Sequence, residues 1–225
     1  MQDDWIRTRR EVTTAFDNIA DLYRENFAGE LDVKPFDRAF LERVAARIPP
    51  GEPVLEVGAG PGQIGAFLQA HGVPSVASDA SRGQLREARI LDPARPAAAV
   101  DLVRLPVRAG ALGAIVGFYC LIYGPQDAHD VVFREWRRAL RPGGLAVIAV
   151  QAGRGTIEHD GYQGRPARLT VVMRDPDLLV TQLGRNGFTV DECVVRPPYD
   201  GERVDRCYVV ASVAGSGGLG ERGRS

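Results

Sequence analysis

The segment between residues 54 and 70 constrains the fold of this chain more than any other part of it. A short apolar run, Val54–Val57, leads into the turn Gly58-Ala59-Gly60-Pro61-Gly62 and then into a helical pattern, Gln63–Ala70. Glycines let a ligand approach the backbone closely, and the first turn of a helix offers unpaired N–H groups. A glycine turn of this kind also serves in many α/β folds simply to reverse the chain. The segment therefore predicts a strand, a tight turn and a helix, with a nucleoside-type ligand as the functional interpretation.

The same alternation of strand and helix continues along the chain. Apolar runs predict further strands at residues 75–78, 97–100, 112–118, 145–150, 188–195 and 203–213. Helical spacing predicts helices at residues 11–27, 36–48, 81–91, 127–140 and 175–186. Continuous apolar strands indicate a parallel sheet covered on both faces, whereas the last two strands are close enough in sequence to pair antiparallel. We therefore predict an α/β fold: a doubly wound, mostly parallel, seven-stranded sheet with a C-terminal antiparallel strand pair.

A chain of 225 residues is long enough for one domain with a full core. We expect residues 1–48 to form an N-terminal helical cap and residues 49–213 to form the ligand-binding domain. Residues 151–170 break the pattern with Gly, Arg, His, Asp and Tyr, and are expected to form a loop-like insertion that acts as a lid. The Gly-, Ser- and Arg-rich segment 214–225 is expected to be a disordered tail.

Composition excludes several classes of function. The 28 basic and 29 acidic residues give a net charge of -1, so the chain carries no electrostatic footprint for nucleic acid. The 3 cysteines lack metal-type spacing, which favours reduced thiols in the cytoplasm and predicts no metal site. No apolar run is long enough to span a bilayer, so no membrane partner is expected. Nothing in the sequence predicts an oligomeric state.

The register of the glycines bears on which ligand the turn holds. In a dinucleotide site, G-x-G-x-x-G begins directly after the strand, and its third glycine packs the helix on that strand. Counted from Gly58, the third position is Gln63. Gly60, Gly62 and Gly65 meet the pattern two residues late. The register therefore disfavours a pyrophosphate and leaves a nucleoside possible.

Two aspartates follow successive predicted strands. Asp79 ends the second strand, where its carboxylate could accept hydrogen bonds from both hydroxyls of a ribose. Asp101 ends the third strand, where it could accept from an adenine amino group. Either one alone could equally be a helix cap or a solvated loop charge. Together, at the carboxyl edge of the sheet beside the glycine turn, they favour a binding site.

Five segments, in their order and spacing, resemble the class I S-adenosylmethionine-dependent methyltransferases, especially the small-molecule branch that includes ubiquinone and menaquinone biosynthesis enzymes. They are the glycine turn with Glu56 before it, Ala77-Ser78-Asp79-Ala80-Ser81, the D-x-x-x-L-P segment 101–106, the Leu-Arg-Pro-Gly-Gly turn 140–144 and the opening helix around residues 17–23. The resemblance implies a Rossmann-like fold, S-adenosylmethionine as the cofactor, and methyl transfer to an O, N or C atom of a small molecule. A role in natural-product biosynthesis is one hypothesis.

The resemblance also implies residue roles. Gly58, Ala59, Gly60 and Gly62 would approach the methionine and ribose, and Glu56 would lie near the cofactor's ammonium, directly or through water. Asp79 and Ala80 would hold the ribose side, and Asp101 and Leu102 the adenine. Tyr23 would come from the covering helix. Phe118 and Tyr119 would border the sulfonium, where electron-rich rings suit a cation, although Phe118 could equally be a plain core residue.

The catalytic residues are less constrained. Many relatives have a histidine where this chain has Tyr123, so a histidine base at that position is absent. Methyl transfer from a sulfonium can proceed by alignment alone, and a base is needed only for acceptors such as a hydroxyl or a protonated amine. The candidate bases are Tyr123, His129, His159 and Tyr162. His159 is preferred because it lies in the insertion, whereas His129 is expected on the surface at the start of a helix.

Two other functions remain as alternatives. The first is a protein with the same cofactor pocket that transfers no methyl group. The second is an NAD-dependent oxidoreductase, which is disfavoured by the late glycine register, by the charged Glu56 within the first strand and by the C-terminal antiparallel pair.

Overall fold

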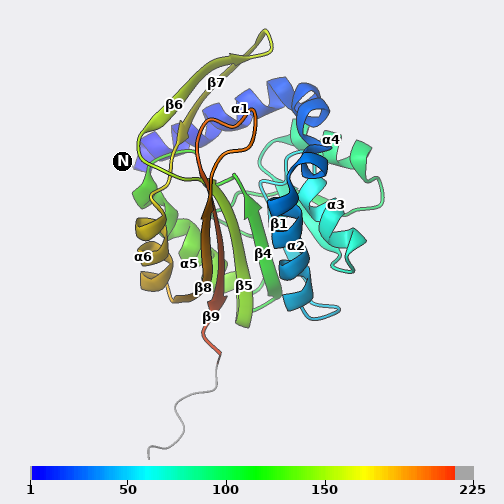
Figure 1. Ribbon diagram of the computed structural model, residues 1–225, viewed down its shortest axis with the longest axis vertical. Helices are drawn as coiled ribbons and strands as arrows, with labels where there is room; N and C mark the ends of the chain where they lie inside the picture. The colour runs from blue at the N-terminus through cyan, green and yellow to red at the C-terminus, as the bar shows by residue number, and fades with distance from the viewer. Residues whose placement is uncertain (1, 216–225) are drawn as a thin grey trace, which may run out of the picture.

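A seven-stranded sheet forms the centre of the computed structural model, which describes residues 2–215 and the side chains from residue 8 onward (Figure 1). The strand order is β3-β2-β1-β4-β5-β9-β8, and β9 alone runs antiparallel to its neighbours. The predicted sheet with its C-terminal antiparallel pair is confirmed. Its strands are β1 (Val54–Val57), β2 (Ser75–Asp79), β3 (Ala97–Ala99), β4 (Leu112–Phe118), β5 (Leu140–Gln151), β8 (Phe188–Arg196) and β9 (Arg206–Val213).

Helices cover both faces of this sheet. Along the fully buried strand β4, Ile115 belongs to one core cluster, and Ala114 and Val116 belong to the other. This alternation follows from the two-residue period of a strand, and it explains why β4 has apolar residues throughout. The helices are α1 (Gln2–Phe27), η1 (Glu30–Val33), α2 (Pro35–Arg47), α3 (Gln63–Ala70), α4 (Arg82–Leu91), η2 (Gln126–Ala128), α5 (His129–Ala139) and α6 (Pro176–Arg185).

The segment predicted as an irregular loop is a second, two-stranded sheet, and that prediction is wrong. Residues 151–170 overlap the antiparallel hairpin of β6 (Thr156–Tyr162) and β7 (Arg165–Val172). The hairpin forms because Ala167, Leu169 and Val171 alternate along β7 and bury one face of it. Gln163 and Gly164, both with positive φ, form its turn.

Several element boundaries also differ from the prediction. Helix α1 begins at residue 2 instead of 11. The predicted turn 141–144 lies inside β5, where the pairing with β4 shifts register between Leu112 and Ala114. Of the predicted tail, residues 216–225 lie outside the described residues. None of the helices within residues 2–215 combines the length and apolar character needed to cross a membrane.

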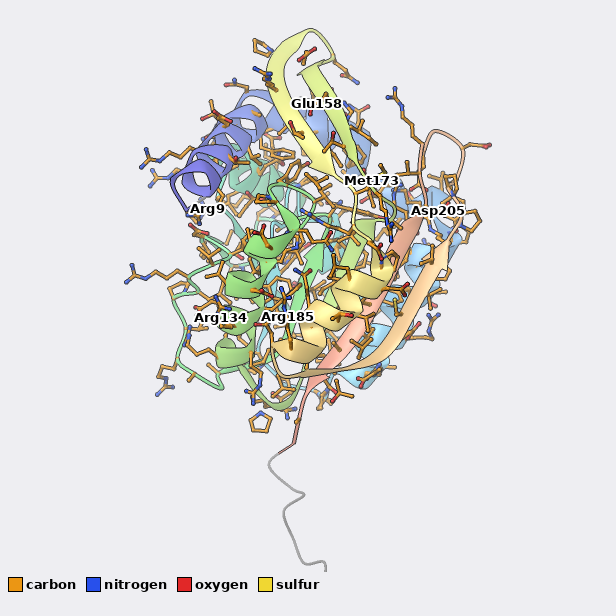
Figure 2. The ribbon with its side chains drawn as sticks, turned by 90° about the vertical axis from the view of Figure 1, so that its left-hand side faces the viewer. Arg9, Arg134, Glu158, Met173, Arg185 and Asp205 are labelled. Atoms are coloured by element: carbon orange, nitrogen blue, oxygen red, sulfur yellow. The ribbon has the colours of Figure 1, made fainter. Side chains whose placement is uncertain are left out.

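Helix α1 and the hairpin lie side by side above the carboxyl edge of the sheet (Figures 1 and 2). On one side of α1, the Asp17 carboxylate accepts hydrogen bonds from Ser81 Oγ and the Gly83 backbone N–H, both at 2.7 Å. A Cβ on Gly83 would lie 3.0 Å from the Cα of Asp17, so glycine allows α1 to pack closely on α4. On the other side, Arg165 of β7 forms an ion pair with Asp21. The helix therefore bridges the main domain and the hairpin.

A buried ion pair lies beneath the glycine turn. Arg95, in the loop before β3, donates to the carboxylate of Glu56 in β1, and both side chains are 3% exposed. The same guanidinium donates to the Ser75 carbonyl oxygen at 3.1 Å and to the Gly62 carbonyl oxygen at 3.0 Å. A Cβ on Gly65 would lie 1.8 Å from a guanidinium nitrogen of Arg95, so the position needs glycine to make room for the arginine. Arg95 thus joins β1, β2 and the start of α3.

We expect Arg95→Met to lower the free energy of unfolding by about 3–5 kcal/mol, because the substitution leaves Glu56 buried without a counter-ion. Urea unfolding monitored by circular dichroism measures this loss. The matched control is Arg141→Met, which breaks a 2.8 Å ion pair with Glu52 at the surface and should cost at most about 1 kcal/mol. Equal losses in the two variants would contradict a special role for the buried pair.

Candidate binding and active site

A cavity of about 960 Å³ lies at the carboxyl edge of the sheet, below α1 and the hairpin. It brings together most of the side chains that the sequence predicts for the site, although these come from six separate segments. The predicted residues that line the cavity are Tyr23, Glu56, Gly58, Ala59, Gly60, Asp79, Ala80, Asp101, Leu102, Phe118, Tyr119, Tyr123, His159 and Tyr162. Gly62 is not among the lining residues.

The three glycines of the turn have positive φ but different surroundings. A Cβ on Gly58 would lie 2.4 Å from the Cβ of Cys120, so this glycine is required by packing within the protein. A Cβ on Gly60 would meet only the Tyr23 ring at 3.7 Å and a Gln84 oxygen at 3.8 Å, and so would project into space at the cavity. Gly62 caps α3 and faces Arg95 and Ala88. The backbone at Gly60 is therefore the part of the turn most open to a ligand.

Asp79 is held rigidly beside this turn. One of its carboxylate oxygens accepts from the Gly60 N–H at 3.0 Å and the other from the Ser81 N–H at 2.8 Å. Burial raises the pKa of this carboxyl to about 6, while these two backbone hydrogen bonds favour its ionised form. The carboxylate therefore has a fixed position, and each oxygen keeps a lone pair for a donor from a ligand.

Asp101 has a more exposed place at the rim of the cavity. Its side chain is 47% exposed and forms an ion pair with Arg9 of α1. A second carboxylate oxygen accepts from the Val103 N–H at 3.1 Å. The neighbouring Leu102 and Val100 also line the cavity. Asp101 therefore links the start of α1 to the end of β3 as well as bordering the cavity.

Glu56 touches the floor of the cavity, but its carboxylate binds Arg95. Burial raises the pKa of this carboxyl, and the adjacent guanidinium opposes the rise. The sequence prediction placed Glu56 near an ammonium and did not include Arg95. The one sequence signal for such a partner is a glutamate inside an apolar strand, which requires a counter-ion once it is buried.

Aromatic rings form the wall of the cavity below the hairpin. The Phe16 ring lies 5.3 Å from Tyr23 and 5.6 Å from Tyr123, and Tyr23 lies 6.3 Å from Tyr162, between ring centroids. Burial raises the pKa of Tyr123 well above its usual range, so its phenol is neutral at physiological pH. Tyr119 has a positive φ of 57° and its hydroxyl lies 3.2 Å from that of Tyr208. Phe16 is a lining residue that the sequence prediction did not include.

Of the two histidine candidates, His159 lines the cavity and His129 does not. His159 lies on β6 directly opposite Leu169, so its side chain shares the face that lines the cavity. Glu158, labelled in Figure 2, is on the other face of the hairpin, where it accepts from Thr170 Oγ1 at 2.7 Å. His129 is 1% exposed and does not line the cavity, so its predicted surface location is wrong. Burial lowers the pKa of His129 to about 3.

A set of polar side chains that the sequence prediction missed also lines the cavity. Glu30, Lys34, Gln63, Glu202 and Arg206, here called the mixed-charge cluster, all line the cavity. Lys34 Nζ lies 2.6 Å from a Glu30 oxygen and 3.6 Å from a Glu202 oxygen, and Arg206 Nε lies 3.5 Å from Glu202. Gln63 Nε2 donates to Glu30 at 2.7 Å. These residues come from distant parts of the chain, so no local sequence pattern predicts that they lie together.

Comparison with known proteins agrees with this geometry. A family model described as a methyltransferase domain matches residues 54–144. A demethylmenaquinone methyltransferase from Beutenbergia cavernae is 33% identical over 144 residues, which are 62% of this chain and 57% of the relative. The chain thus matches little more than half the length of that curated relative.

Two solved structures show the same fold. The complex of DhpI with S-adenosylhomocysteine has a TM-score of 0.72 and 21% identity, and covers 92% of this chain and 97% of that one. The [4+2]-cyclase SpnF has a TM-score of 0.61 and 18% identity, and covers 80% of this chain and 81% of that one. Taken together, the sheet order, the motifs and the family match show that residues 54–144 of this chain are similar to a methyltransferase domain.

Proposed function

We propose that this chain transfers a methyl group from S-adenosylmethionine to an O, N or C atom of a small molecule. The observation that carries the proposal is a cavity with two different sides: a rigid carboxylate beside the open Gly60 backbone, and an aromatic chamber formed by the rings of Phe16, Tyr23, Tyr123 and Tyr162. The first side suits a nucleoside and the second suits an acceptor with an apolar body.

The cofactor would lie along the carboxyl edge of the sheet. Asp79 would accept from the ribose hydroxyls, with Ala80 beside it, and the adenine would extend toward Asp101 and Leu102. Gly58, Ala59 and Gly60 would line the path of the methionine part, and Phe118 and Tyr119 would border the sulfonium. Gly62 would not contact the cofactor, because it lies behind the turn against Arg95 and does not line the cavity.

The reaction would depend mainly on alignment. A methyl group leaves the sulfonium as the acceptor attacks in line, so the enzyme gains most by fixing the two reactants and excluding water. Residues of α1 and of the hairpin line the cavity, and these two elements would supply that exclusion. His159 is the candidate base for an acceptor that must lose a proton, whereas the neutral phenol of Tyr123 would orient the acceptor by a hydrogen bond.

One observation favours a second candidate function. SpnF, a cyclase by its description, has the same fold, so the fold alone does not determine that a methyl group is transferred. The alternative is that this chain binds the cofactor without transferring its methyl group. A turnover measurement separates the two functions.

The proposal is tested in two steps. Isothermal titration calorimetry should detect binding of S-adenosylmethionine and no binding of NAD. Cell extracts incubated with the protein and isotopically labelled cofactor should then yield a small molecule that carries the labelled methyl group. Binding without any labelled product would favour the non-transferring alternative, and preferential binding of NAD would reject the cofactor assignment.

We expect the affinity for S-adenosylhomocysteine to fall as the pH is lowered from about 7 to about 5. The pKa of Asp79 is about 6 in the unliganded protein, and only the ionised carboxylate can accept from both ribose hydroxyls. Below that pKa, each pH unit should weaken binding by up to about tenfold, with release of a proton on binding. Calorimetry across this pH range provides the measurement.

Asp79→Asn should bind more weakly and lose this pH dependence, whereas Asp101→Asn at the exposed rim should retain it. A pH-independent affinity in the unaltered protein would reject the assignment of the ribose to Asp79.

We expect His159→Gln to lower turnover at least about tenfold on an acceptor that must be deprotonated, because the side chain faces the cavity. Its affinity for the cofactor should stay unchanged. Glu158→Gln is the matched control, since this neighbouring residue faces away from the cavity, and it should leave both quantities unchanged. Steady-state kinetics with the identified acceptor measure the effect, and unaltered turnover in His159→Gln would remove this residue from the mechanism.

A further inference from the structure

The orientation of the cofactor follows from the order of the strands. If the ribose lies at the end of β2 and the adenine at the end of β3, the remaining part of the molecule must extend the other way, toward the ends of β1 and β4. That remaining part is an α-amino acid, with an ammonium and a carboxylate. This step rests on the proposed function.

The mixed-charge cluster lies on that side of the cavity. Gln63 begins the helix that follows β1, and Arg206 faces the ring of Tyr119, the residue after β4, with its guanidinium 5.7 Å from the ring centroid. The Glu30, Lys34, Glu202 and Arg206 side chains are only 9–14% exposed. Charged groups of both signs, nine-tenths buried at one end of a cavity, match a ligand group that itself carries both signs.

The carboxylate of Glu56, the acidic residue before the glycine turn, already has a partner inside the protein. Its carboxylate forms a buried pair with Arg95, and an ammonium that approached it would compete with a guanidinium held by hydrogen bonds to Ser75 and Gly62. Glu30 is paired too, with Lys34 at 2.6 Å, but both residues line the cavity and the Glu30 carboxylate lies beside Gln63 on its wall. The Gln63 Oε1 atom is buried and has no hydrogen-bond partner among the described residues, so it is an acceptor in need of a donor.

We propose that Glu30 and Gln63 bind the ammonium of the cofactor's amino acid, in place of Glu56, and that Lys34 and Arg206 face its carboxylate. An ammonium has three N–H donors and no acceptor, so a carboxylate and an adjacent carbonyl oxygen suit it. Glu30 lies in η1, directly after α1, and the amino acid would therefore hold the end of the covering helix against the sheet.

Three ligands separate recognition of the ammonium from recognition of the nucleoside. S-adenosylhomocysteine carries the whole amino acid, its deaminated analogue lacks only the ammonium, and methylthioadenosine lacks the amino acid altogether. Calorimetry with the full chain gives the affinity for each ligand in the unaltered protein, in Glu30→Gln and in Gln63→Met.

In both variants we expect the affinity for S-adenosylhomocysteine to fall about tenfold or more, the loss typical of a charged hydrogen bond. Their affinities for the deaminated analogue and for methylthioadenosine should stay within about twofold of the unaltered protein, which also shows that the variants are folded. Glu87→Gln is the matched control: it removes a 2.8 Å ion pair with Arg24 of α1 at a residue that does not line the cavity, and should leave all three affinities unchanged.

An equal loss for all three ligands would mean that Glu30 only shapes the cavity, and would overturn the inference. So would unchanged affinity for S-adenosylhomocysteine in both variants. If the unaltered protein bound none of the three nucleosides, the proposed cofactor itself would be rejected, and the inference with it.

Discussion

The ion pair between Glu56 and Arg95 is the interaction on which the binding edge of this protein depends. Two charges that leave water together are tolerated only when hydrogen bonds satisfy the remaining donors and acceptors, and here the guanidinium also binds the Ser75 and Gly62 carbonyl oxygens. One side chain therefore sets the spacing of two strands and the start of α3. Arg95 holds the glycine turn through the Gly62 carbonyl oxygen, and the Gly60 N–H of the same turn donates to Asp79. The position of the Asp79 carboxylate therefore depends on the buried ion pair.

The cavity has two sides of different origin. Its cofactor side is made of residues that directly follow strands, as in other open α/β sheets, where ligands bind at the carboxyl ends. The opposite side comes from α1 and the hairpin, two elements outside the seven-stranded sheet. Changes at the ring-bearing residues of these elements, such as Phe16 and Tyr162, can therefore reshape the aromatic chamber while Asp79 keeps its hydrogen bonds to the Gly60 and Ser81 N–H groups.

How far the sequence predicts the structure depends on how local each signal is. Helix α3 has its predicted bounds, Gln63–Ala70, because the glycine turn and the helical pattern lie within a few residues of each other. The strand β4 also has its predicted bounds, because its apolar run is continuous. The hairpin was missed because only β7 has the alternation of Ala167, Leu169 and Val171, whereas β6 is mostly polar and exposed. Most predicted lining residues follow strands, and strand ends can be located from sequence.

Contacts between distant residues leave no such signal. Arg95 is 39 positions from Glu56, and Gln63 is 33 positions from Glu30. A glutamate inside an apolar strand signals that Glu56 needs a counter-ion, but nothing local in the sequence identifies Arg95 as that partner, and only folding brings such pairs together. The charged contacts of the site are therefore the part that the structure adds.

The polar contacts on the two sides of α1 differ in how far water reaches them. Toward α4, the helix packs at Gly83, and the Asp17 carboxylate accepts half-buried hydrogen bonds from Ser81 Oγ and the Gly83 N–H. Added salt hardly changes these contacts. Toward the hairpin, the Arg165 and Asp21 side chains are 43% and 46% exposed, and an ion pair so open to water is screened by dissolved ions. Rising ionic strength thus weakens this ion pair, while the apolar contacts of Ala15 and Ile19 with Ala167 and Leu169 keep the covering helix on the hairpin.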